Sequence, residues 1–145
     1  MKTVSTGIKI RAKPEKVWDI LTKFSDYEEW NPVMTRIIGE ASLGKKIEVH
    51  IHTIKGKNRI YHPTITKFDI NEELRWQGRS FLPGIFEGER IFEIKEISSE
   101  EISLIHLEVF RGIGVKLMGN RLDEDLQQSF EAMNIALKAR AESKV

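Results

Sequence analysis

Three residues in the second half of the chain combine side-chain types that can orient a polar group or move protons. Arg90 lies in a run where apolar and polar residues alternate, and His106 and Glu108 alternate in a later run. A cation, an imidazole and a carboxylate on neighbouring strands could orient a carbonyl or carboxylate group. They could also transfer protons, with His106 or Glu108 as acid or base and Arg90 stabilising the developing negative charge. We therefore take Arg90, His106 and Glu108 as candidate catalytic residues.

Whether these side chains meet depends on the register of two strands. Arg90 alternates with apolar residues, including Phe92, so it is expected to point inward. A two- or four-residue turn would pair Phe92 with Leu107 and direct His106 and Glu108 outward. A three- or five-residue turn would pair Phe92 with Glu108 and direct both inward. The later strand is apolar on both faces, so its pattern does not distinguish the two registers. The charged residues could also form only a buried ion pair, or a cross-strand pair on the outer face of the sheet.

A long helix near the end of the chain must cover these strands. From Leu122 to Leu137, apolar residues recur at steps of four, four, three and four, which is the spacing of one helix face. We expect this helix and a curved sheet to leave an apolar cavity, although the same side chains could instead meet and fill the space. The residues predicted to bind a ligand there are Val49, Ile51, Trp76, Phe81, Phe86, Phe92, Phe110, Leu122, Leu126, Phe130 and Met133.

Most of the chain before this helix has the alternation and turn residues of β-strands. Residues 3–11 are predicted to form a strand, and Pro14 opens a helix at a position where proline is tolerated. Residues 33–112 are predicted to form consecutive antiparallel strands, one of them over 59–70. Because strands and helices are segregated, we predict an α+β fold in one domain, residues 1–145, with the long helix across one wide sheet.

Five short motifs occur in order along nearly the whole chain. They are Pro14-Glu15-Lys16-Val17-Trp18, Trp30-Asn31-Pro32, Leu74-x-Trp76-x-Gly78, Phe86-x-Gly88-x-Arg90-x-Phe92 and His106-x-Glu108-x-Phe110-x-Gly112. Together they resemble the bacterial polyketide cyclase/dehydratase-like (SRPBCC) group of the START and birch-pollen-allergen superfamily. The resemblance implies a helix-grip fold: a curved seven-stranded antiparallel sheet around the C-terminal helix, two short helices after the first strand, and an apolar cavity. It also favours the inward orientation of His106 and Glu108.

Other patterns that could hold a metal or cofactor are incomplete. His50-x-His52 places two imidazoles on one strand face, but no third ligand is evident, so we expect no metal. Gly112-x-Gly114 lacks the third glycine of a dinucleotide fingerprint and is interpreted as a hinge before the helix. We therefore expect no cofactor.

Two turns carry unusual side chains. Lys55, Lys57 and Arg59 form a basic hairpin tip, interpreted as a solvated turn because no aromatic platform accompanies it. The loop 81–85, Phe-Leu-Pro-Gly-Ile, is apolar and could close the mouth of the cavity as a lid, or fold into its own core.

The composition narrows the classes of partner. A net charge of +1 over 145 residues gives no reason to expect nucleic acid. No apolar run reaches the roughly 18 residues of a membrane span. The absence of cysteine removes disulfide and thiolate chemistry, and the first seven residues lack the apolar run of a signal peptide, so we expect a cytoplasmic protein.

Three functions fit these observations. The first is binding of a small hydrophobic molecule, lipid- or polyketide-like, in the cavity. The second is an enzyme of the polyketide cyclase/dehydratase type that uses Arg90, His106 and Glu108. The third is a chaperone-activator-like interaction module that uses the outer sheet face. The apolar outer face of the strand 102–110 also suggests a homodimer contact.

Overall fold

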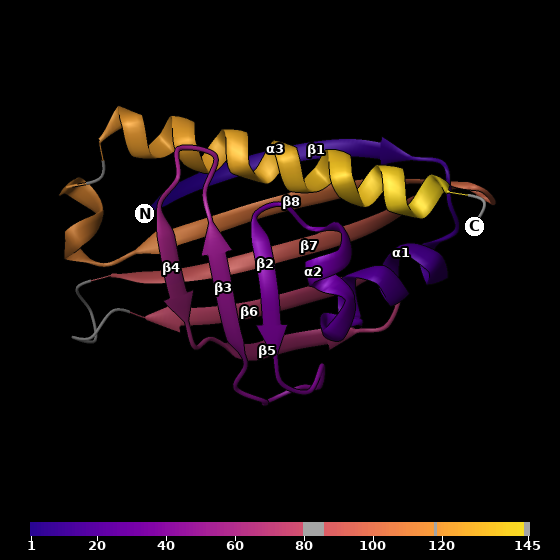
Figure 1. The fold of residues 1–145 in the computed structure, drawn as a ribbon, viewed down its shortest axis with the longest axis horizontal. Coiled ribbons are helices and arrows are strands. Elements are labelled where there is room, and N and C mark those ends of the chain that lie inside the picture. Colours follow the sequence, from indigo (N-terminus) through magenta and orange to yellow (C-terminus); the bar gives the residue numbers. More distant parts are fainter. Residues whose placement is uncertain (80–85, 118, 144–145) are drawn as a thin grey trace.

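A long C-terminal helix lies across antiparallel strands, as the sequence predicts (Figure 1). The computed structural model describes residues 1–79, 86–117 and 119–143. In chain order the elements are β1 (Lys2–Ile10), α1 (Pro14–Thr22), η1 (Phe24–Asp26), α2 (Tyr27–Trp30), β2 (Met34–Ile38), β3 (Glu48–His52), β4 (Asn58–Tyr61), β5 (Thr64–Asp69), β6 (Glu73–Arg79), β7 (Glu87–Ser98), β8 (Glu101–Arg111), η2 (Ile113–Leu117) and α3 (Asn120–Glu142). The predicted α+β class is confirmed.

Within the described residues, eight strands form two sheets, so the predicted count of seven in one sheet is wrong. The larger sheet has the order β1-β8-β7-β6-β5, and the smaller one has the order β2-β3-β4. The predicted strand over 59–70 is divided at Pro63, because proline lacks the N–H donor that a strand ladder needs. The Pro63 carbonyl still accepts a hydrogen bond from Ile47 N at 2.9 Å, and Lys46 bridges Thr64, so the two sheets stay connected.

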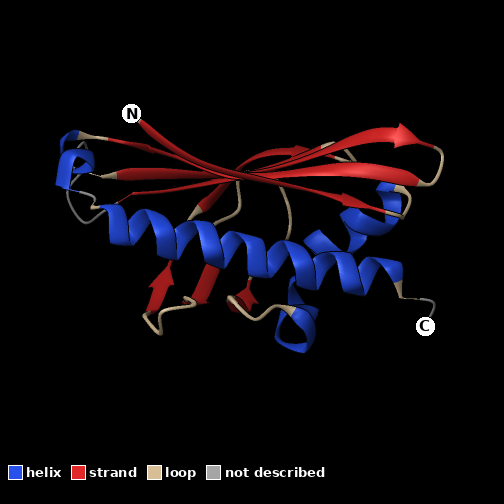
Figure 2. Ribbon diagram, turned by 90° about the horizontal axis from the view of Figure 1, so that it is seen from above, coloured by secondary structure: helices blue, strands red, loops and turns tan. Residues whose placement is uncertain are grey.

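The helix α3 lies between the two sheets (Figure 2). Its apolar residues recur at the helical period, so one stripe can be buried along its length. Phe130, Met133 and Leu137 on this stripe are buried. None of the helices in the described part of the chain is long and apolar enough to cross a membrane.

The two short helices predicted after the first strand are present, with the 3-10 turn η1 between them. Pro14 is the first residue of α1, and Val17, Trp18 and Leu21 form its buried face. These side chains join the packed core against the C-terminal half of α3. The short helices therefore close one end of the space between the sheets.

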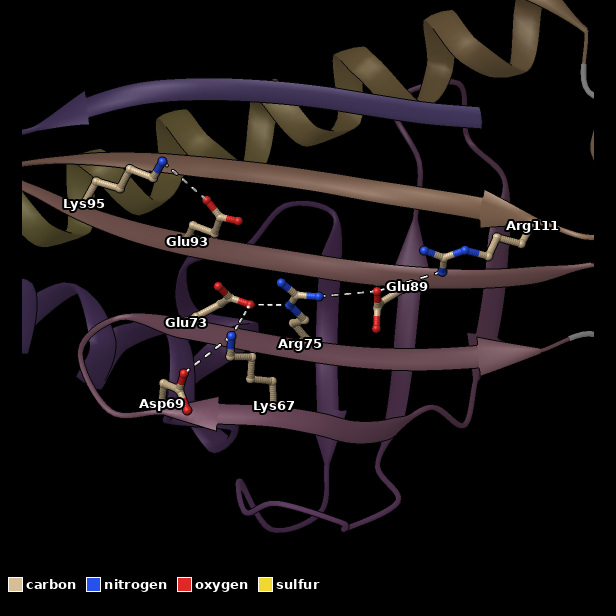
Figure 3. A network of polar contacts seen from close by, with 8 residues as sticks. All are labelled: Lys67, Asp69, Glu73, Arg75, Glu89, Glu93, Lys95 and Arg111. Atoms are coloured by element: carbon tan, nitrogen blue, oxygen red, sulfur yellow. Dashed lines mark hydrogen bonds and ion pairs between the residues drawn. The ribbon is translucent and has the colours of Figure 1, made fainter. Parts of the chain in front are cut away.

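The outer face of the larger sheet carries a network of paired charges (Figure 3). Arg75 contacts Glu73 and lies 3.7 Å from Glu89, which in turn lies 4.0 Å from Arg111. The hydrogen bond that Arg75 donates to the Glu73 carboxylate raises the pKa of Arg75 above its ordinary value. Glu93 and Glu89 pair across the sheet with Ile105 and Val109, so charges lie along one side of the outward face of β8, which the sequence suggested as a homodimer contact. The remaining pairs are Lys67–Asp69, Lys67–Glu73 and Lys95–Glu93.

Candidate ligand-binding site

A cavity of about 390 Å³ lies between the strands and the N-terminal half of α3. Seven of the eleven residues predicted to bind a ligand border it. They are Val49, Ile51, Trp76, Phe86, Phe110, Leu126 and Phe130.

The other four predicted ligand-binding residues do not form its described wall. Phe92 and Met133 are at most 1% exposed and belong to the buried interior beyond the cavity. Phe81, with the rest of the proposed lid at 81–85, lies outside the described residues. The side chain of Leu122 also lies outside the described part of the chain.

Two glycines leave room for the cavity in the sheet. Gly78 on β6 pairs directly with Gly88 on β7, and both border the cavity. A Cβ atom at Gly88 would lie 3.4 Å from Glu108 Oε1, and one at Gly78 would lie 3.7 Å from Pro63. Because neither glycine carries a side chain, this rung of the sheet does not fill the space in front of it. The sequence motifs contain both glycines, but sequence reasoning gave them no role in the cavity.

A β-bulge in β7 sets the register of the β7–β8 hairpin. The tip pairs Ser98 with Glu101, and continuing this register would pair Phe92 with Leu107. The register instead shifts by one residue between Glu96 and Ser98. Because a slip of one residue exchanges the two faces of a strand, the bulge decides which β8 side chains face the interior.

This shift brings the three candidate catalytic residues together on the inner face. Arg90 pairs with Glu108, and Phe92 pairs with His106. The predicted pairing of Phe92 with Glu108 is therefore wrong. The preferred inward orientation of His106 and Glu108 nevertheless occurs, because the bulge changes the register by one residue.

Arg90 and Glu108 form an ion pair in the cavity wall. Arg90 Nε and Nη2 donate to Glu108 Oε2 at 3.4 and 3.3 Å. The guanidinium carbon lies 4.3 Å from the centre of the Phe130 ring, which is a cation–π arrangement. Arg90 is 6% exposed, so the carboxylate supplies the charge partner that a buried cation requires. The Arg90–Glu108 pair is therefore a polar site in a largely apolar cavity lining.

His106 is completely buried and is not among the described residues that border the cavity. Its Nε2 accepts a hydrogen bond from Arg90 Nη1 at 3.1 Å, so Nδ1 carries the proton and donates to Asn134 Oδ1 at 2.9 Å. Burial and the Arg90 charge lower the pKa of His106 well below its ordinary value, and the Asn134 hydrogen bond opposes this only in part. The ring is therefore neutral, with both nitrogens occupied by protein partners.

Asn134 and Thr6 complete this buried network. Asn134 Nδ2 donates to Thr6 Oγ1 at 2.8 Å, and the Thr6 hydroxyl donates to the His106 carbonyl at 2.8 Å. Sequence reasoning missed the role of Asn134. The available signal was its position four residues after Phe130, which places an amide on the apolar face of the helix.

The β3–β4 hairpin reaches α3 (Figure 1). Residues of both its strands and of its turn border the cavity. Ile54 N donates to Ser129 Oγ, and Lys55 N donates to Asp125 Oδ1, both at 3.1 Å. Asp125 is therefore 2% exposed, although the helical spacing places it off the apolar stripe, on the face that the sequence pattern assigns to solvent. The assignment was wrong because helical spacing alone does not show that a distant hairpin covers that side of the helix.

The basic residues of this hairpin are exposed, and two of them also border the cavity. Lys57 and Arg59 border the cavity, while Lys55 Nζ lies 3.7 Å from Glu124 on α3. The prediction of a solvated turn is therefore confirmed.

The histidines near β3 contact nearby acceptors. His50 and His62 both contact Glu48, at 2.7 and 3.2 Å, and these hydrogen bonds lower the pKa of Glu48. His52 lies 2.6 Å from Asn58 Oδ1. Among the described residues, no group of three histidine, aspartate or glutamate side chains is arranged to hold one metal ion.

Comparison with known proteins supports the fold that the motifs implied. Residues 1–142 match the family described as polyketide cyclase/dehydrase and lipid transport. No protein with a curated description matches this sequence.

Solved structures of the same fold come from several bacteria. A START superfamily protein from Mycobacterium smegmatis is 17% identical, with a TM-score of 0.77 and 97% of each chain covered. A hypothetical protein from Helicobacter pylori is 13% identical, with a TM-score of 0.79 and coverage of 97% of this chain and 88% of that chain. The Aha1 dimer from Colwellia psychrerythraea is 19% identical, with a TM-score of 0.71 and coverage of 98% and 97%. At these identities the likeness establishes the helix-grip fold alone.

Proposed function

This chain belongs to the polyketide cyclase/dehydrase and lipid transport family, and on that premise we propose that it binds a small hydrophobic molecule beside α3. The observation that carries the proposal is the cavity of about 390 Å³. Pockets that bind small molecules typically enclose roughly 300–1,000 Å³ and combine apolar walls with a few polar groups. This cavity has both features, so a lipid- or polyketide-like molecule is the ligand class that fits it.

The apolar walls provide the driving force for binding. Trp76, Phe86 and Phe110 contribute large aromatic surfaces, and the rings of Phe86 and Phe110 lie 5.5 Å apart. A ligand that covers these rings removes apolar surface from water, both on the protein and on itself. Affinity therefore comes mainly from the body of the ligand.

The Arg90–Glu108 pair fixes how that ligand is oriented. Both residues border the cavity, and their charges offset each other. Such a pair can bind a neutral carbonyl or hydroxyl group by hydrogen bonds without attracting a strongly charged group. We assign His106 the role of a positioning residue, because it holds Arg90 from behind.

Native mass spectrometry of protein purified without detergent tests this proposal. We expect a fraction of the protein to carry an additional mass that extracts into organic solvent after denaturation. A cavity-free protein purified in parallel controls for adventitious lipid. The proposal is overturned if the protein is always empty and also fails to bind the apolar fluorescent probe phenylnaphthylamine.

A second candidate function is a cyclase- or dehydratase-type reaction, favoured by the position of Glu108 and Arg90 on the cavity wall. Glu108 would accept a proton from the bound substrate, and Arg90 would stabilise the negative charge that develops. His106 would hold Arg90 in place, because both of its ring nitrogens are occupied.

Glu108→Gln separates catalysis from binding. The amide keeps an acceptor for Arg90 but is a very weak base, so turnover of a β-hydroxy or poly-β-ketone thioester should be lost while phenylnaphthylamine still binds. Glu89→Gln, on the outer face of β7, is the matched control. Equal turnover in wild type and Glu108→Gln would remove Glu108 from the reaction.

An interaction module that uses the outer sheet face has less support. The charged side chains there pair with one another, as Figure 3 shows. A partner would have to replace these contacts, in which the charges already offset each other.

A further inference from the structure

We propose that Asp125 and Ser129 form a second polar binding point in the cavity, and that it selects ligands carrying a hydroxyl group. The inference rests on the proposed ligand-binding function and adds the chemistry of the ligand. Both residues lie on α3, on the wall formed by the helix, whereas Arg90 and Glu108 lie on strands β7 and β8.

Asp125 has one carboxylate oxygen without a hydrogen-bond donor. Its Oδ1 accepts from Lys55 N at 3.1 Å, whereas its Oδ2 is buried and has no partner among the described residues. The residue borders the cavity and is 2% exposed. A buried carboxylate oxygen without a donor is strongly unfavourable. Asp125 Oδ2 therefore needs a hydrogen-bond donor, and a bound molecule can supply one.

No described cation supplies that donor. Lys55 Nζ lies 3.7 Å from the carboxylate of Glu124, the residue that precedes Asp125 on the helix. Lys57 and Arg59 border the same cavity, yet no ion pair joins either of them to Asp125 in the described part of the structure. Arg90 uses its Nε, Nη1 and Nη2 atoms for Glu108 and His106.

Ser129 narrows the chemistry of the ligand group that would donate to Asp125. It lies four residues after Asp125, so the two side chains are neighbours on the helix surface. Its Oγ accepts from Ile54 N at 3.1 Å, and no acceptor for its hydroxyl proton is found within the described ranges. An alcohol can donate to Asp125 Oδ2 and accept from Ser129. An ammonium group would satisfy only Asp125, and a carboxylate would be repelled by it.

Competition with phenylnaphthylamine by three ligands of equal chain length tests the inference. Decanol can donate and accept a hydrogen bond, decyl methyl ether can only accept one, and decanoate is an anion. We expect decanol to bind wild-type protein about tenfold or more tightly than decyl methyl ether, because an analogue that lacks the donor leaves Asp125 unpaired. Decanoate should bind more weakly than decanol.

Two variants connect this preference to Asp125. In Asp125→Asn the amide oxygen can still accept from Lys55 N, but an NH₂ donor replaces the free oxygen, so the preference for decanol over the ether should fall to near one. Glu124→Gln removes the same charge from the adjacent, exposed position and should keep the preference.

Each outcome has a defined meaning. If all three ligands bind and decanol shows no preference in wild type, the inference fails and the binding function stands. If no ligand displaces the probe and the probe itself does not bind, both fail. A preference that survives in Asp125→Asn also overturns the inference. If that variant does not fold, a wild-type crystal structure with decanol decides, because a hydroxyl away from Asp125 Oδ2 contradicts the proposal.

Discussion

The two halves of the space beside α3 are filled differently. Along the C-terminal half, Met133, Leu137 and Ala141 are at most 1% exposed and lie in a continuous packed core. Along the N-terminal half, Leu126 and Phe130 border a cavity of about 390 Å³. One helix with one apolar spacing therefore supports a packed core at one end and a binding site at the other.

Side-chain volume on two rungs of the same strand pair explains the difference. Leu74 pairs with Phe92 across β6 and β7, and both are fully buried. Further along the same strands, Gly78 pairs with Gly88 at the cavity. The backbone pairing is equivalent at both rungs, so residue size decides whether the space is filled.

A buried imidazole marks the boundary between the two halves. The His106 ring stacks on Phe92 at 4.5 Å, with 28° between the ring planes, and on Phe130 at 4.5 Å, with 15°. Phe92 belongs to the packed core, and Phe130 belongs to the smaller cluster beside the cavity. The Arg90–His106–Asn134 network therefore supports the wall that separates core from cavity.

The largest expected effect on stability comes from removing the Arg90 cation from this network. Arg90→Met leaves Glu108 without its cation and His106 without its donor, so we expect a loss of about 3–5 kcal/mol in the free energy of unfolding. Arg90→Met combined with Glu108→Leu should recover most of this loss. Urea denaturation measures both variants. A single variant within about 1 kcal/mol of wild type would show that the pair does not support the wall.

Truncation of one leucine in each half compares the two regions directly. Leu137→Ala should destabilise the protein by about 2–5 kcal/mol, because the packed core cannot refill the space. Leu126→Ala should cost less than about 1 kcal/mol, because Leu126 is only half-buried and already faces a cavity. Equal losses, measured by urea denaturation, would contradict the distinction between a filled and an unfilled half.

A smaller effect concerns pH and depends on His106. Its pKa in the folded protein is lowered by burial and by the Arg90 charge. The unfolded chain, with a histidine pKa near 6.5, therefore takes up the proton first, so stability falls as the pH drops below about 6.5. The slope approaches about 1.4 kcal/mol per pH unit until the folded-state pKa is reached.

His106→Gln tests this assignment, because glutamine offers an acceptor and a donor but does not titrate. The decline in stability between about pH 6.5 and pH 5 should be shallower in this variant than in wild type. His52→Gln removes an exposed imidazole from the β3–β4 hairpin and controls for the loss of a histidine elsewhere in the chain. An unchanged slope in His106→Gln would show that His106 does not stay neutral in the folded protein.

Local periodicity predicted most of the fold. The apolar steps along α3, the alternation in β1 and the proline at the start of α1 each depend on neighbouring residues, and all three elements occur as expected. The break at Pro63 could also have been predicted, because proline in the middle of a strand removes a ladder hydrogen bond.

The site depended on features that are not local. The shift between Glu96 and Ser98 has no sequence signature, yet it decides that His106 and Glu108 face inward. The burial of Asp125 arises because a hairpin about 70 positions earlier in the chain donates to it. Types of site residue could therefore be predicted from sequence, whereas their partners and exposure required the tertiary arrangement.

The central claim is that the space in front of Gly78 and Gly88 is open and binds an apolar molecule. The most direct test is a fluorescence titration of phenylnaphthylamine against wild type, Gly78→Ile and Gln77→Ile. Gly78→Ile places a branched side chain in the cavity, whereas Gln77→Ile places the same side chain on the opposite face of β6. We expect Gly78→Ile to weaken binding about tenfold or more and Gln77→Ile to leave it unchanged. Equal affinity in all three proteins would contradict the account.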